Sequence, residues 1–277
     1  MRPTGKRSNT RRLLAFTFLW MAAGMIGSGV RPVRALDVFT LWRQPEFPLR
    51  MTEGAWADFR MQVMAGGRRD EGLTRIVCLG REHGSDDESW LIELLPLDEF
   101  PDGRFEPVAG EGARLRLSRS LLERTGHLLD AVISAERWSG GVPEKVSEDQ
   151  LRNDPLVSAS LDAEFTPDLV EAKDPTTRVI TGTQYLCDQF VMSAADTQSA
   201  DLPAGRMIQM TTREITAAVH ADLPFLGLAY AAERIRSESK LDPPSRKFAP
   251  PPPQVRVEVM ELLGFGWQAE PSLTRGD

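Results

Sequence analysis

The sequence predicts a mainly β protein of the α+β class, with a curved antiparallel sheet or half-barrel and one or two helices. Three observations lead to this prediction. Apolar and polar residues alternate with period two over much of the chain, at least seven segments have the pattern of strands, and one segment carries apolar residues at helical spacing. Strands that follow one another without helices between them favour antiparallel pairing, so a single curved or closed sheet is the simplest arrangement.

The first segment, residues 1–35, has the three parts of an export signal. It carries seven basic side chains and no acidic one, an apolar stretch from Leu13 to Val30, and a small residue at Ala35. We expect cleavage after Ala35. The remainder, residues 36–277, is predicted to form a single β-rich domain.

Arg11 and Arg12 stand together directly before an apolar run, which resembles the twin-arginine signal of bacterial folded-protein export. Arg31 and Arg34 lie close to the expected cleavage site, where the general secretory route disfavours positive charge. We therefore favour the twin-arginine route, and an ordinary secretory leader is the alternative. An uncleaved anchor is less favoured because glycines near the end of the apolar stretch weaken a spanning helix. Both routes predict a periplasmic or extracellular protein.

Charge excludes one class of partner. Of the 33 basic residues in the chain, the leader holds seven, so the mature chain would carry 26 basic residues against 40 acidic ones, a formal net charge of −14. Such a surface repels the phosphates of nucleic acids and of anionic lipid head groups. We expect no nucleic acid partner, and contact with the membrane only through the leader before its cleavage.

The strand candidates are spread through the mature chain. They are Ala55–Val63, Thr74–Leu79, Trp90–Leu95, Arg114–Leu117, the two parts of Val179–Met192 that flank Gly182, Met207–Val219 and Val255–Leu263. The second and third candidates are joined by a polar stretch that contains glycine, which is typical of a β-hairpin.

Residues Ser120–Trp138 form the segment with helical spacing, and we predict a helix there. Gly126 lies within it, so a turn between two strands is the alternative. The polar stretch from Gly140 to Pro175 is expected to cross the surface of the sheet. Residues 242–253 hold six prolines and are predicted to form an extended Pro-rich loop, a spacer inside the domain rather than a docking motif.

The chain has two cysteines, Cys78 and Cys187, both in apolar strand-like runs. An oxidising compartment would permit a disulfide between them. The alternative is two separate buried thiols, which behave as small apolar side chains.

The sequence indicates no catalytic residue, no metal site and no cofactor. His83, His127 and His220 are far apart, and no phosphate-binding loop, nucleophile elbow or zinc-binding helix motif is present. The acidic cluster Glu82–Glu88 is interpreted as a solvated turn, with a calcium loop as the alternative. His220 precedes Asp222 but has no nucleophile beside it. A hydrolase or metal-dependent enzyme that uses one of these groups remains a further alternative.

Seven methionines are distributed over the strand regions. They are Met51, Met61, Met64, Met192, Met207, Met210 and Met260. Methionine adapts to irregular apolar partners, so a curved sheet lined in this way could hold a lipid-like ligand in its concavity. The alternative is that these side chains fill the core. The sequence does not indicate which residues would bind a ligand.

Three segments, Val179–Cys187, Leu223–Leu228 and Val257–Gly266, resemble the C-terminal part of exported bacterial β-proteins related to lipoprotein-sorting carriers of the LolA type. In that group a glycine and a cysteine lie in one strand, a Pro-X-X-Gly turn follows, and a closing strand ends near a Leu-Leu-Gly-Phe-Gly-like segment. The resemblance implies a curved antiparallel sheet with a helical plug, and a carrier of acyl chains or lipoproteins.

We therefore expect an exported, non-enzymatic envelope protein that binds a hydrophobic ligand, either a lipid or the acyl chains of a lipoprotein. The alternative is a structural or interaction protein of the envelope, with a filled core and an envelope protein as its partner.

Overall fold

The computed structural model describes residues 36, 38–83, 88–125, 128–154, 156–157, 165–202, 205–242, 244 and 250–274. The predicted export signal, with Arg11, Arg12 and Ala35, lies outside these residues and stays a prediction. His127 and residues 243 and 245–249 of the Pro-rich loop also lie outside them.

The described residues form one antiparallel sheet. Its strands are β1 (Trp56–Ala65), β2 (Arg68–His83), β3 (Glu88–Glu99), β4 (Phe105–Pro107), β5 (Gly112–Ser118), β6 (Val132–Ser139), β7 (Val142–Lys145), β8 (Leu169–Ile180), β9 (Thr183–Leu202), β10 (Gly205–Val219), β11 (Leu228–Asp242) and β12 (Gln254–Gly266). The spatial order is β7-β6-β5-β3-β2-β1-β12-β11-β10-β9-β8, and β4 pairs with β3. Within this part of the chain β7 and β8 are not paired with each other, so the sheet is open. This confirms the predicted fold class.

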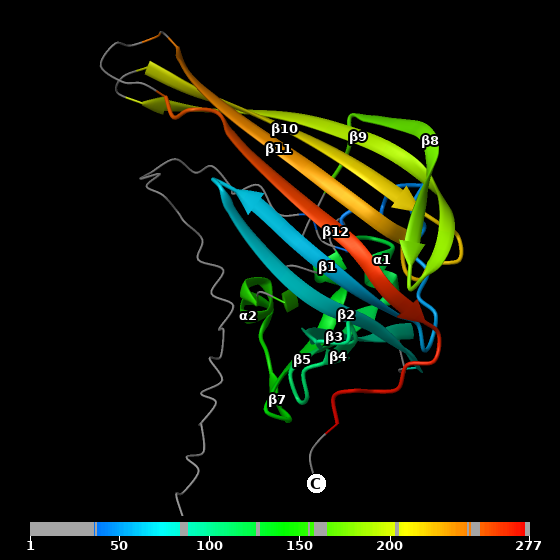
Figure 1. The fold of residues 1–277 in the computed structure, drawn as a ribbon. Coiled ribbons are helices and arrows are strands. Elements are labelled where there is room, and N and C mark those ends of the chain that lie inside the picture. Colours follow the sequence, from blue (N-terminus) through cyan, green and yellow to red (C-terminus); the bar gives the residue numbers. More distant parts are fainter. Residues whose placement is uncertain are drawn as a thin grey trace, which may run out of the picture.

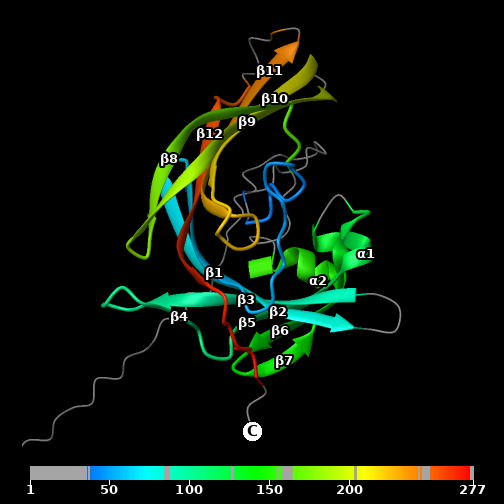
Figure 2. The same ribbon diagram turned by 90° about the vertical axis from the view of Figure 1, so that its right-hand side faces the viewer.

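The sheet is strongly curved. Figures 1 and 2 show that the strands from β8 to β12, together with β1, form a curved wall, and that β3, β5, β6 and β7 turn beneath it. The helical elements that accompany the sheet in the described residues are short: α1 (Arg119–Leu122), α2 (Glu148–Asn153) and a 3-10 turn, η1 (Leu128–Ala131), and residues 156–157 are also helical. The N-terminal segment and the helices lie on the concave side (Figure 2).

The main hydrophobic core fills this concave side. The N-terminal segment, residues 38–50, contributes Phe39 and Phe47, whose side chains are fully buried. Phe39 packs edge-on against Phe225, with ring centroids 5.9 Å apart, and Phe47 packs in the same way against Phe190 at 5.5 Å. The concavity of the half-barrel is therefore occupied by the chain's own residues.

Two turns explain parts of the sequence pattern. Thr181 and Gly182, with φ of 48° and 80°, form the two-residue connection between β8 and β9, as expected for a tight hairpin turn. In the Pro-X-X-Gly turn, Gly227 donates from its backbone nitrogen to the carbonyl oxygen of Pro224 at 2.9 Å. Gly227 has φ of 71°, and a Cβ there would lie 2.7 Å from the carbonyl oxygen of His220, so glycine is required.

Every predicted strand is present, and the predicted hairpin is formed by β2 and β3. The strands β4, β6, β7 and β11 were not expected. Of these, β11 is the largest difference, because its concave face carries Glu233 between Ala231 and Ile235, which interrupts the apolar alternation.

The predicted helix over Ser120–Trp138 is wrong. The chain forms a single helical turn at α1 and a 3-10 turn at η1, and then pairs with β5 as strand β6. Leu128 and Leu129 are buried by the 3-10 turn, whereas Ile133, which the helix would have buried, is half exposed. Sheet pairing has therefore replaced the helical alternative.

Cys78 in β2 and Cys187 in β9 are both free and buried in the main core. The structure thus corresponds to two separate thiols and not to the disulfide. Burial raises the pKa of the Cys78 thiol to about 11, and it also raises the pKa of Cys187. Both thiols are therefore held in their unreactive, protonated form at neutral pH.

The helices of the described residues are too short or too polar to cross a bilayer.

Candidate functional site

The concave face, where the sequence analysis places a ligand, is packed. Met192 and Met260 are fully buried in its core, while Met64 and Met210 are exposed elsewhere. These methionines therefore do not line a common open surface, and the filled-core alternative describes the concave face.

A second hydrophobic cluster lies on the opposite, outer face of the sheet. Its buried members are Val77, Leu95, Trp138 and Leu273. Since neighbouring residues of a strand point to opposite faces, Val77 faces outward between two residues of the main core, Ile76 and Cys78. The cover of this outer cluster is the C-terminal segment, residues 267–274, which follows β12.

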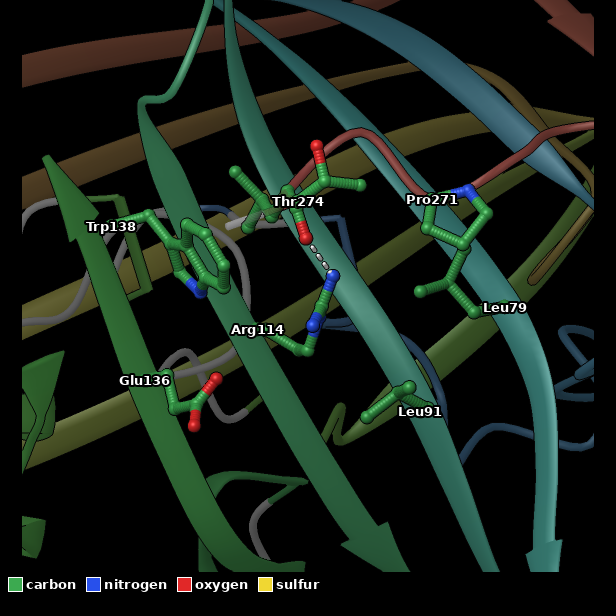
Figure 3. A pocket seen from close by; sticks show the side chains of 8 residues that line it. Leu79, Leu91, Arg114, Glu136, Trp138, Pro271 and Thr274 are labelled. Carbon is green, nitrogen blue, oxygen red and sulfur yellow. Dashed lines mark hydrogen bonds between the residues drawn. The ribbon is translucent and has the colours of Figure 1, made fainter. Parts of the chain in front are cut away.

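A pocket of about 460 Å³ opens beside this cluster (Figure 3). It is lined by Leu79, Leu91, Arg114, Glu136, Trp138, Pro271, Leu273 and Thr274. The sheet contributes one wall through β2, β3, β5 and β6, and the C-terminal segment contributes the other (Figure 3). Its volume is within the range of about 300–1,000 Å³ that is typical of small-molecule sites.

A buried ion pair stands at the centre of this outer face. Glu93 is completely buried and accepts hydrogen bonds from Nε and Nη2 of Arg114, at 3.2 and 2.6 Å. The two residues are cross-strand neighbours on β3 and β5. The Arg114 guanidinium also lies 5.2 Å from the ring of Trp138, a cation–π contact that fixes its plane.

The same ion pair holds the C-terminal segment through its backbone. Ser272 and Leu273 donate from their backbone nitrogens to Glu93, at 2.9 and 3.3 Å, and Arg114 donates to the carbonyl oxygen of Leu273 (Figure 3). Further upstream, Ala269 donates to the carbonyl oxygen of Gly54 at 2.9 Å. The segment is thus attached mainly by main-chain hydrogen bonds and by one buried side chain, Leu273.

A second ion pair lies on the same outer face, between β2 and β1. Arg75 donates to both carboxylate oxygens of Asp58, at 2.6 and 2.8 Å, and its guanidinium lies 4.4 Å from the ring of Trp56. Burial raises the pKa of Asp58, and Arg75 partly offsets that shift. Two paired arginines, each against a tryptophan, therefore line the outer face.

The pocket is chemically simple. Five apolar side chains form most of its lining, and Arg114 is already paired. The residues that line it include no cysteine, histidine or serine. Such a wall suits an apolar segment of a ligand.

The candidate metal and catalytic groups of the sequence are not brought together. Among the residues that the structure describes, no three His, Cys, Asp or Glu side chains are placed to hold a metal ion. In the acidic cluster, Glu88 is paired with Arg81 and Arg119, which lower its pKa; the side chains of Glu82 to Asp87 lie outside the described part of the chain.

His220 belongs to the turn that precedes β11. Its Nδ1 accepts a hydrogen bond from the backbone nitrogen of Asp222 at 3.1 Å, and its ring packs edge-on against Tyr185. The carboxylate of Asp222 is 3.8 Å from Nδ1. His220 therefore takes part in the hydrogen bonding and packing of this turn.

The outer-face residues were not predicted from the sequence. A usable signal was present: Glu93 interrupts the apolar run of β3, and Arg114 stands in the neighbouring strand β5. A charged residue of each sign in neighbouring apolar strands favours a buried cross-strand pair.

No family model matches the sequence, and no curated protein matches it. The fold is similar to that of the LolA superfamily protein NE2245 from Nitrosomonas europaea, with 10% identity and a TM-score of 0.30 over 88% of this chain and 99% of that one. It is also similar to a protein from Bacteroides fragilis described as exported and YmcC-like in fold, with 9% identity and a TM-score of 0.22 over 79% and 99%. Both similarities are distant.

Proposed function

We propose that this protein is an exported, non-enzymatic envelope protein that binds a hydrophobic ligand, an acyl chain of a lipid or lipoprotein, in the pocket beneath residues 267–274. The observation that carries the proposal is the pocket itself, with a volume of about 460 Å³ and mostly apolar walls. Export is supported by the predicted leader.

The lining favours an acyl chain over a charged ligand. Leu79, Leu91 and Trp138 offer apolar surface from the sheet, and Pro271 and Leu273 offer it from the C-terminal segment. Each methylene that moves from water to such a surface contributes about 0.8 kcal/mol. Glu136 adds negative charge to the lining, which disfavours an anionic group inside the pocket.

The C-terminal segment gives the ligand a way in. Pro271, Ser272 and Thr274 are exposed, and Leu273 is the only residue between 267 and 274 whose side chain is buried. Lifting this segment would expose the pocket without disturbing the main core on the other face.

Palmitic acid binding to the mature protein tests the proposal. Leu91→Trp places a larger side chain in the pocket and is expected to abolish binding, as measured by calorimetry and by a shift in melting temperature. Leu186→Trp is the matched control, because Leu186 is exposed on β9, far along the sheet order from β3. Binding that is unchanged in Leu91→Trp, or absent in the unmodified protein, would contradict the proposal.

A second candidate function rests on the filled concave face. With Phe39 and Phe47 buried there, the sheet could act as a structural or interaction protein of the envelope. Crosslinking in the envelope that captures a stable heteromer, from a protein that carries no lipid, would favour this function over ligand binding.

A further inference from the structure

The first residue described, Leu36, is buried on the concave side of the sheet. Its side chain is 1% exposed, and its backbone nitrogen donates to Oε2 of Glu258 in β12 at 2.6 Å. Amide hydrogen bonds are usually about 2.9–3.0 Å long, whereas bonds from a charged nitrogen to a carboxylate are about 2.7–2.9 Å. The contact is short, as is usual for hydrogen bonds in which one partner is ionised.

Glu258 belongs to a buried cluster of charged side chains. Glu258 is the direct cross-strand partner of Glu233 on β11, and both carboxylates are buried. Like charges directly opposite each other destabilise a sheet. Arg213 pairs with Glu233, and Arg256 pairs with Glu258.

Burial disfavours the charged form of both carboxylates in this cluster. Burial raises the pKa of Glu258, with Arg256 and Arg213 opposing the shift and Glu233 adding to it, and burial likewise raises the pKa of Glu233. The side chain of Arg256 is 34% exposed, so its charge is partly screened by water. An amide at Leu36 supplies a hydrogen bond to Glu258 but no net charge.

The sequence places the end of the export signal at Ala35, one residue before Leu36. That prediction uses charge, hydropathy and residue size in the leader. The burial of Leu36 and its contact with Glu258 are independent of it. The leader pattern and the contact of Leu36 with Glu258 therefore both point to the peptide bond between Ala35 and Leu36.

We propose that the Ala35–Leu36 bond is the processing site, and that the mature amino-terminal ammonium of Leu36 is held as a buried ion pair by Glu258. Hydrolysis of this bond by a leader-removing protease consumes one water molecule, leaves a carboxylate on Ala35 and leaves an amino group on Leu36, which takes up a proton. The new positive charge lies against the carboxylate of Glu258.

Removal of the leader would then anchor the segment that fills the concave face. Leu36 leads directly into the N-terminal segment, whose Phe39 and Phe47 fill the concavity. Fixing the first residue to β12 anchors this segment at its free end. The inference is independent of the proposed ligand in the outer pocket, which lies on the other face of the sheet.

The first test is the intact mass of the protein recovered from its host's envelope. The expected mass is that of a chain beginning at Leu36. A chain that begins at any other residue overturns the proposal.

The second test is a double-mutant cycle with four proteins, released from a fusion by a protease that leaves no extra residue. They begin at Leu36 or at Ala35, each with Glu258 or with Glu258→Gln. Retaining Ala35 keeps an amide donor at Leu36 but removes its charge, and we expect the ratio of unfolded to folded protein to rise about 5- to 30-fold. With Glu258→Gln the same extension is expected to cost much less. Equal costs in both backgrounds, or no cost at all, overturn the proposal.

Glu261→Gln is the matched control, because Glu261 lies on β12 and is exposed. It should leave the effect of the extension unchanged. If Glu258→Gln does not fold, the labelling rate of the α-amino group decides the question instead. A terminus at Leu36 should resist an amine-reactive reagent in the folded protein, and one at Ala35 should not; equal labelling of the two overturns the proposal.

Discussion

The two faces of the sheet are covered by opposite ends of the chain, and they are built differently. On the concave face the N-terminal segment inserts large side chains, and Phe39, Leu41 and Phe47 are each at most 1% exposed. On the outer face the C-terminal segment buries Leu273 and leaves a pocket of about 460 Å³ beside it. The inner cover is therefore part of the core, whereas the outer cover can be lifted.

Both faces also bury carboxylates, and they neutralise them differently. Glu93 on the outer face is satisfied by Arg114 and by two backbone donors of the C-terminal segment. On the concave face Glu258 and Glu233 oppose each other across two strands. Each chain end is thus docked through a buried acid, by amide groups at one end and, in our proposal, by an ammonium at the other.

The largest expected effect is on the concave face. Phe47→Ala removes a fully buried ring from its contact with Phe190, and we expect it to lower the free energy of unfolding by about 4 kcal/mol. Denaturant unfolding measures this loss. If the two faces act separately, the variant that remains folded should still bind palmitic acid, and loss of binding would show that the faces are coupled.

Glu93→Ala is expected to have the next largest effect. It leaves Arg114 without its carboxylate and frees the backbone donors of Ser272 and Leu273, so unfolding should become easier by about 3 kcal/mol. Limited proteolysis should cut the C-terminal segment faster than in the unmodified protein. Arg104→Ala is a suitable control, because Arg104 is exposed and its ion pairs are at the surface. An unaltered cleavage rate would mean that the ion pair does not hold the segment.

Ending the chain after Ala269 tests how much less the C-terminal segment contributes to stability than the N-terminal segment does. The truncation removes the burial of Leu273 but keeps the hydrogen bond from Ala269 to Gly54, so we expect a loss of about 2 kcal/mol. Pocket walls on the sheet would become accessible, and an environment-sensitive apolar dye should bind more strongly. If the truncation lowered the free energy of unfolding as much as Phe47→Ala does, the C-terminal segment would also be part of the hydrophobic core.

The smallest effect concerns pH. Because burial raises the pKa of Glu233, the folded state holds its proton more tightly than the unfolded state does. The resulting stability is present below the ordinary glutamate pKa and is lost as the pH rises through the raised value. Glu233→Gln should therefore flatten the fall of stability with rising pH across the acid range. An equal slope in both proteins, from unfolding curves across that range, would contradict this.

The fold was largely predictable where one face of a strand is buried. In β1 the alternation of Ala57 and Phe59 with polar neighbours predicts the strand, and two apolar runs predict the β2–β3 hairpin. The strand β11 was missed because Glu233 occupies a core position, which no local pattern indicates. The helix predicted over residues 120–138 failed because pairing with β5 stabilises a strand, and pairing between distant segments has no signal in local spacing.

The candidate site was not predictable in the same way. Glu93, Arg114 and Trp138 come from three strands, and the C-terminal segment that they bind is more than a hundred residues away in sequence from all of them. The sequence predicted a ligand in the concavity, because apolar residues are common on that face. The residues that close the concavity are apolar for the same reason, so composition does not distinguish a filled face from an open one.

Whether the outer face carries a ligand beneath the C-terminal segment is tested most directly by native mass spectrometry of the mature protein from its own host's envelope, followed by organic extraction. We predict an excess over the polypeptide mass that resolves into acyl-containing molecules and is lost in Leu91→Trp. A bare polypeptide mass, or an excess that persists in that variant, would contradict the proposed ligand.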